Sequence, residues 1–147
     1  MRKEVLALKN FLSQQKLLYQ KMFEISLSQK EGKVDVEFLF ATLREKQRLV
    51  LEIEQLDEKM IGLKEWWKVN KTTLPEEDRI EITRLFSEIE EILQELLKLE
   101  GIIAEKVKGN QKELERELGK VSAGKRAVKA YYGKKGSRES RFVDRRQ

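Results

Sequence analysis

The chain has 147 residues, of which 39% are charged and 39% hydrophobic, and its formal net charge is +5. It contains neither cysteine nor histidine, which excludes disulfides, thiol nucleophiles, imidazole bases and the usual zinc sites. A single proline among abundant Leu, Glu and Lys is typical of long helices or coiled coils. No stretch approaches the roughly 18 apolar residues of a membrane span, and no signal peptide is recognisable. We therefore expect a cytoplasmic, all-α chain.

Three segments carry apolar residues at alternating spacings of three and four, the period of helices that pack lengthwise on their neighbours. They cover residues 2–30, residues 36–69 and the chain from Pro75 onward. Asp35 is placed to cap the start of the second helix, and Pro75 suits the first turn of the third. The pattern predicts an antiparallel bundle of three long helices. The expected core positions are Leu8, Phe11, Gln15, Leu18, Met22 and Ile25 in the first helix; Leu39, Thr42, Lys46, Leu49, Ile53, Leu56, Met60, Leu63 and Trp67 in the second; and Ile82, Leu85, Ile89, Ile92, Leu96, Leu99 and Ile103 in the third.

Two features of the second helix leave alternatives open. Lys46 stands on the apolar stripe, where a lone polar residue can fix register or partner choice, or can extend its ammonium outward to solvent. Trp66 and Trp67 end the helix and diverge by about 100°, so one ring can cap the core while the other meets the loop or solvent. We favour a capping role over a binding role for this pair.

The third helix weakens after Ile103. A thinner apolar line continues past the glycines at positions 109, 119 and 124, and each interior glycine costs about 1 kcal/mol relative to alanine. Residues 120–147 carry ten Lys and Arg against Glu139 and Asp144, a net charge of +8, which leaves −3 for residues 1–119. We predict a helical domain over residues 1–119, with a weaker helical extension at its end, and a flexible, partly disordered basic tail over residues 120–147.

The titratable side chains give little support to catalysis. The carboxylates of the third helix favour a solvated face over a metal or acid–base site, because no histidine accompanies them. We expect no enzyme activity, no metal and no cofactor. The basic tail with Tyr131, Tyr132 and Phe142 offers a weaker alternative, since cations and aromatic rings can bind phosphates and stack on bases. The acidic residues concerned are Glu76, Glu77, Asp78, Glu88, Glu90, Glu91 and Glu95.

Four short stretches carry a family resemblance. They read GKVD at residues 32–35, LREKQRL at 43–49, GKRAVKAY at 124–131 and SRFVD at 140–144. In this layout the chain resembles the FlgN-type flagellar export chaperones, helical cytoplasmic proteins that hold hook–filament junction subunits before type III export. A FliT-type chaperone, which handles the filament-cap protein, fits the helices but fits the terminal SRFVD stretch less well.

The resemblance implies that the late third helix and the segment after it bind a protein client, and that the export apparatus is a second candidate partner. A segment of this kind would order on binding. A structural coiled-coil or oligomerisation module is the main alternative, with a homo-oligomer left open, and a nucleic-acid binder is a weaker one. The client-binding residues that we expect are Val107, Leu114, Leu118, Val121, Val128, Tyr131, Tyr132 and Phe142.

Overall fold

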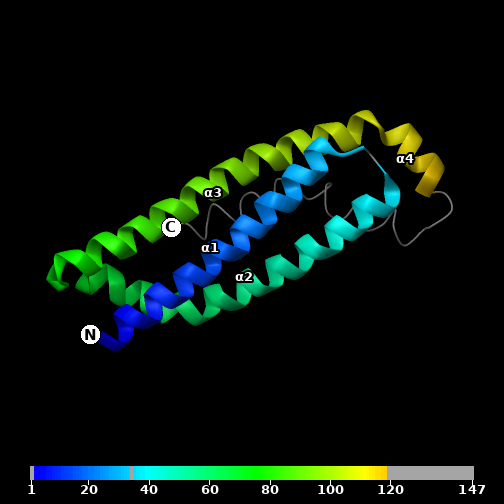
Figure 1. Cartoon of the computed structure of the whole chain (residues 1–147). Helices are drawn as coiled ribbons and strands as arrows, with labels where there is room; N and C mark the ends of the chain where they lie inside the picture. Colours follow the sequence, from blue (N-terminus) through cyan, green and yellow to red (C-terminus); the bar gives the residue numbers. More distant parts are fainter. Residues whose placement is uncertain (1, 34, 119–147) are drawn as a thin grey trace.

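The computed structural model describes residues 2–33 and 35–118, and these form helices without a strand. The predicted antiparallel bundle of three long helices is confirmed (Figure 1). The predicted tail, residues 120–147, lies outside the described residues. The elements in chain order are α1 (Arg2–Glu31), α2 (Val36–Asn70), the 3-10 turn η1 (Lys71–Thr73), α3 (Glu76–Gly109) and α4 (Gln111–Leu118).

The starts of α2 and α3 follow from local chemistry. The Asp35 side chain accepts a hydrogen bond from the backbone N–H of Glu37 at 2.9 Å, which confirms the predicted N-cap. Pro75 stands immediately before α3 in an extended conformation, and the first turn of α3 carries three acidic residues. Their negative charge is favourable beside the positive end of the helix dipole.

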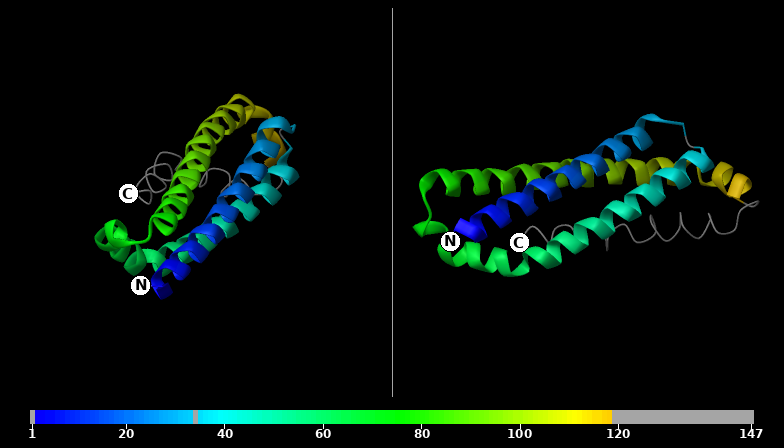
Figure 2. Two further views of the ribbon diagram at one scale, coloured as in Figure 1. Left: turned by 60° about the vertical axis from the view of Figure 1, so that its left-hand side comes forward. Right: turned by 60° about the horizontal axis from the view of Figure 1, so that its bottom comes forward.

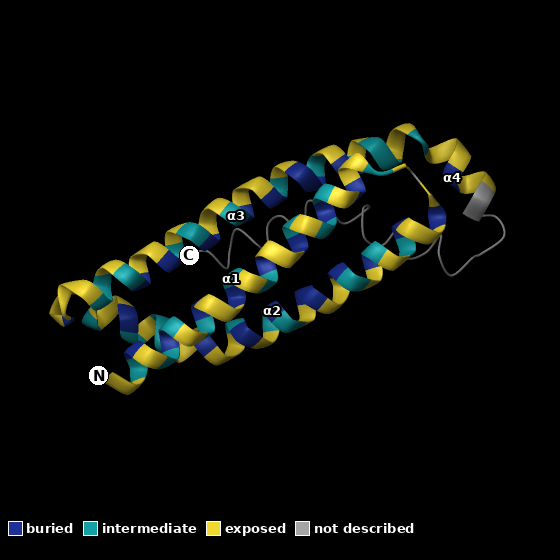
Figure 3. Cartoon of the chain, viewed as in Figure 1, coloured by how far each residue is buried: buried dark blue, intermediate teal, exposed yellow. Residues whose placement is uncertain are grey.

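The three long helices are not equivalent in their packing. α1 packs closely against both α2 and α3, whereas α2 and α3 make few close approaches to each other. Figure 1 accordingly shows α1 between its two neighbours, and the right view of Figure 2 shows α1 crossing α3. In Figure 3 the buried positions follow the inner faces of the bundle and the exposed ones its outer faces. The core is therefore organised around α1.

This position of α1 explains where the predicted core was incomplete. Leu12 and Tyr19 are buried, although the predicted stripe passed beside them, while Phe11 and Leu18 are only half-buried. A helix that contacts two neighbours buries a wider face than the single stripe of a helix pair. The predicted stripes of α2 and α3 were more accurate, because each packs mainly against α1. Of their positions, all are buried except Thr42, Leu63 and Ile92, which are half-buried.

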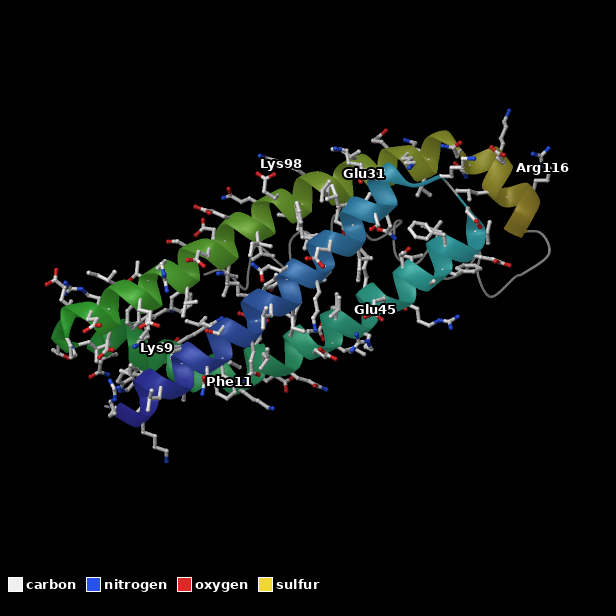
Figure 4. The ribbon with its side chains drawn as sticks, in the orientation of Figure 1. Lys9, Phe11, Glu31, Glu45, Lys98 and Arg116 are labelled. Atoms are coloured by element: carbon white, nitrogen blue, oxygen red, sulfur yellow. The ribbon has the colours of Figure 1, made fainter. Side chains whose placement is uncertain are left out.

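Lysines of α1 meet carboxylates of α3 along the edge of this packing. The Lys9 Nζ lies 2.8 Å from the Asp78 carboxylate and 2.9 Å from that of Glu81, and Lys16 pairs with Glu88. Lys9 is marked on α1 in Figure 4. Part of the acidic face of α3 thus serves to pair α3 with α1. In the part of the chain that the structure describes, no three acidic side chains are grouped so that they could hold a metal ion.

Candidate partner-binding site

α3 continues past Ile103 to Gly109, and the chain then turns at Asn110 into α4. At the turn, the backbone N–H of Asn110 donates to the Val107 carbonyl at 3.2 Å, and the Asn110 side-chain amide donates to the Lys106 carbonyl at 2.9 Å. The backbone N–H of Leu114 then donates to the Asn110 carbonyl at 3.0 Å. Asn110 therefore connects the end of one helix to the start of the next.

Lys106 explains why α3 extends beyond its apolar stripe. Its ammonium donates to the backbone carbonyls of Gln29, at 3.1 Å, and of Lys30, at 2.9 Å, and also to that of Gly32. These carbonyls belong to the end of α1, where no further turn of helix satisfies them. A lysine at this point both supplies donors and places positive charge at the negative end of the α1 dipole. Lys106 thus fastens α3 to the end of α1.

The short helix α4 is anchored to α2 by one leucine. Leu114 is only 3% exposed and forms a second apolar cluster with Val36, Leu39 and Leu43 at the start of α2. Phe40 and Val107 pack against this cluster and are partly buried. Two of the predicted client-binding residues, Val107 and Leu114, therefore pack within the chain itself, in a cluster separate from the main core. The first turns of α2 need an apolar cover, and α4 supplies it.

The remaining predicted client-binding residues lie at the end of the described part of the chain or beyond it. Leu118 is the last residue of α4 and stands one helical turn after Leu114, but its side chain is outside the described set. Arg116, in contrast, is exposed on α4 and points away from the bundle in Figure 4. The other five predicted residues lie outside the described residues: Val121, Val128, Tyr131, Tyr132 and Phe142.

A buried polar cluster joins the three long helices close to this end. The Lys46 side chain is fully buried, and its ammonium donates to the Glu100 carboxylate and to the side-chain oxygen of Gln29, the latter at 2.5 Å. The Ser26 hydroxyl also donates to Glu100, at 2.8 Å. Of the two alternatives for Lys46, extension to solvent is thus wrong. The residue is instead a polar connection within the core, of the kind that can fix helix register.

A groove at the other end of the bundle was not predicted. It has a volume of about 540 Å³ and lies between α2 and α3, with η1 at its closed end. Trp67 lines it, half of the Trp pair for which we predicted a capping role, and contacts Phe86 with ring centroids 6.1 Å apart. Trp67 is 9% exposed and Trp66 is half-buried against the core. The sequence showed both rings but not that α2 and α3 stand apart here.

Comparison with known proteins adds no relative. No family model, curated protein or solved structure matches the chain. Among the described residues, no helix is long and apolar enough to cross a membrane.

Proposed function

We propose that the chain is a cytoplasmic flagellar export chaperone of the FlgN type, which holds a hook–filament junction subunit before type III export. The observation that supports this proposal is the closure of the bundle by α4. Leu114 covers the start of α2, so the described part of the chain supplies an apolar contact of its own at this end. We infer that the apolar residues that follow α4 in the sequence serve to bind a partner. Their order, with the GKRAVKAY and SRFVD stretches, is that of the resemblance.

The position of α4 changes the expected division of roles. Val107 and Leu114 act as anchors that fix the point where the chain leaves the bundle, and do not contact the client directly. Direct contact falls to Leu118, Val121, Val128 and the aromatic residues of the tail, Tyr131, Tyr132 and Phe142. A client helix would lie against this segment through apolar side chains at helical spacing. Ordering the segment on binding reduces the net affinity, which suits a complex that must be released for export.

The experiment measures binding of purified hook–filament junction protein to the full chain by titration calorimetry. We expect Val128→Asp and the double substitution Tyr131→Ala with Tyr132→Ala each to weaken binding by about tenfold or more, since truncation of a buried interface anchor commonly costs 2 kcal/mol or more. Ile61→Asp is the matched control. Ile61 is 63% exposed on α2, so the same kind of change there should leave affinity unaltered.

Removal of residues 119–147 completes the test. This truncation keeps α4 and its anchor, so we expect the thermal unfolding of the bundle to be unchanged and client binding to be lost. A truncated chain that binds the client as tightly as the full chain would contradict the proposal. A stable oligomer by light scattering, with no client binding, would favour the structural coiled-coil alternative. Tight nucleic-acid binding that falls steeply with salt would favour the nucleic-acid alternative.

A further inference from the structure

The groove between α2 and α3 has the length of a short helix. On the α3 side its lining runs from Arg79 to Leu93, and on the α2 side it starts at Asp57 and continues to Lys71 in η1. Each side spans fourteen steps of 1.5 Å along its helix, so the groove is about 21 Å long, or nearly four helical turns. Gln15 and Tyr19 of α1 also line it. A channel of this shape between two long helices matches a third helix laid lengthwise better than a compact small molecule.

The bottom of the groove is apolar. Trp67 and Phe86 contact each other there, and Tyr19, Ile89 and Leu93 continue the apolar lining. Phe86 is only half-buried, so part of its ring is open to the groove. Aromatic anchors at the centre of a desolvated groove are the residues that typically dominate the energy of a protein interface.

The rim of the groove is basic. Lys64, Lys68, Lys71 and Arg79 line it, against Asp57 and Glu90. Lys64 lies 3.8 Å from Asp57, and Lys68 lies 3.6 Å from Glu65 of its own helix. Within residues 2–33 and 35–118, neither Lys71 nor Arg79 has an ion pair. Two cations at the η1 end are therefore available to a negatively charged partner.

From this geometry we propose that the α2–α3 groove binds an acidic amphipathic helix of a partner protein. The apolar face of that helix rests on Trp67 and Phe86, and carboxylates on its flanks meet Lys71 and Arg79. An apolar floor inside a charged rim is the usual anatomy of such an interface, and complementary charge sets orientation and partner choice. The proposal stands apart from the proposed chaperone function, because the groove lies at the η1 end and α4 covers the other end (Figure 1).

The chain's own C-terminal segment is a poorer match for the groove. Residues 119–132 contain four Lys and Arg and no acidic residue, so they would place cations beside a basic rim. The groove also begins 21 residues along α2 from Val36, which is about 32 Å from the helix start that α4 covers. A helix continuing from α4 would need about the same 21 residues to span that distance. Only residues 140–147, SRFVDRRQ, would then reach it, and they carry three arginines against one aspartate, again a positive charge beside a basic rim.

A second copy of the chain is also a poorer match. A symmetric dimer built on this groove would bring the same surface of both chains together. The rim carries four cations, Lys64, Lys68, Lys71 and Arg79, against two carboxylates, so a net positive rim would meet a net positive rim, and like charges across an interface oppose association.

The test uses the full chain and a synthetic peptide of about 14 residues, the length of the groove. The peptide carries Leu at helical spacing on one face and Glu on its flanks, and its binding is followed by fluorescence anisotropy. The control peptide has Lys in place of every Glu. We expect the acidic peptide to bind, the basic peptide not to bind, and the affinity of the acidic peptide to fall as salt rises.

Charge reversal at the rim locates the binding site. The double variant Lys71→Glu with Arg79→Glu should weaken binding of the acidic peptide by about tenfold or more, because two attractions become repulsions. Lys98→Glu is the matched control. Lys98 is 71% exposed on α3, does not line the groove and extends from the outer side of α3 in Figure 4. This variant should bind the acidic peptide like the unmodified chain.

Three outcomes would overturn the proposal. If both peptides bound equally, or if neither bound, the proposal that the basic rim recognises an acidic helix would be wrong. A dimer by light scattering that the acidic peptide dissociates would assign the groove to a second copy. The chain lacks cysteine, so a dye pair on Ser87→Cys at the rim and Ser137→Cys in the tail reports on the third outcome. Strong energy transfer that the peptide abolishes would assign the groove to the chain's own tail.

Discussion

The ammonium of Lys46 and the carboxylate of Glu100 form an ion pair inside the bundle, which joins α2 to α3 across 54 residues of sequence. The Lys46 side chain is 0% exposed and that of Glu100 is 9% exposed. Elsewhere the two helices approach each other little, since both pack on α1. Gln29 and Ser26 of α1 complete the hydrogen bonds of the pair. This polar cluster is thus a specific link among all three long helices.

Loss of one member of the pair should destabilise the fold strongly. Lys46→Met leaves the Glu100 carboxylate buried without its cation, and breaking a buried ion pair in this way costs about 3–5 kcal/mol. We expect a loss of this size in the free energy of unfolding, measured by urea titration. The double substitution Lys46→Met with Glu100→Leu removes both charges and should recover most of the loss. Equal destabilisation by the single and double substitutions would contradict this account.

Lys106 should contribute stability as the cap of α1. Lys106→Ala removes the donor to the Gln29 and Lys30 carbonyls, and we expect a loss of about 1 kcal/mol in the free energy of unfolding. Lys108→Ala is the control, because Lys108 is exposed two residues further along α3. The amides in the last turn of α1 should exchange faster in Lys106→Ala alone. Identical exchange in both variants would mean that Lys106 does not hold this end.

The fold was predictable from the sequence because helix periodicity and capping are local. The bounds of α2, the Asp35 cap and the core stripe of α3 all follow from residues close together in the chain. The widened core face of α1 was not predictable in this way. Burial of Leu12 and Tyr19 depends on α1 lying between two partners, and the periodicity of one helix does not contain that information.

The same distinction applies to the candidate sites. Lys106 and Asn110 follow the apolar stripe of α3, and their partners are the end of α1 and the α3–α4 turn, which no local pattern identifies. The packing of Leu114 could not be predicted, because its partners at the start of α2 lie far away in sequence. The groove depends on a separation between α2 and α3, a property of tertiary arrangement alone.

Leu114 should hold α4 against α2, and its loss should affect α4 much more than the rest of the fold. Leu114→Ala removes most of the buried anchor, and buried Leu→Ala changes commonly cost 2–5 kcal/mol. Because α4 has only eight residues, we expect a local effect. The amides of α4 should lose protection in hydrogen exchange while the global free energy of unfolding falls by about 1–2 kcal/mol. Lys112→Ala, at an exposed position of α4, should change neither quantity. If Leu114→Ala instead lowered the global free energy of unfolding by the full 2–5 kcal/mol, α4 would unfold together with the bundle.

The ion pairs between α1 and α3 should make stability depend on pH at both extremes. The hydrogen bond from Lys9 lowers the pKa of Asp78 below 3.8, and that from Lys16 lowers the pKa of Glu88 below 4.5. A carboxyl group whose pKa is lowered by folding stabilises the fold at pH values above its pKa in the unfolded chain. This stability is lost as the pH falls through its pKa in the folded chain. The hydrogen bonds to Asp78 and Glu81 raise the pKa of Lys9 above 10.5. Lys9 therefore contributes its full stability below pH 10.5, and this contribution is lost as the pH rises through the pKa of Lys9 in the folded chain.

Asp78→Asn tests this dependence through the melting temperature measured from acid to alkaline pH. We expect the variant to melt below the unmodified chain at neutral pH, because Lys9 loses its nearest carboxylate. Its melting temperature should also fall less on acidification below pH 3.8, since one of the groups responsible for that fall has been removed. Glu91→Gln, an exposed change on the same helix, should follow the unmodified chain throughout. Parallel curves for Asp78→Asn and the unmodified chain would show that the Lys9–Asp78 pair does not contribute to folding, because the pH-dependent part of stability must disappear with the carboxylate that causes it.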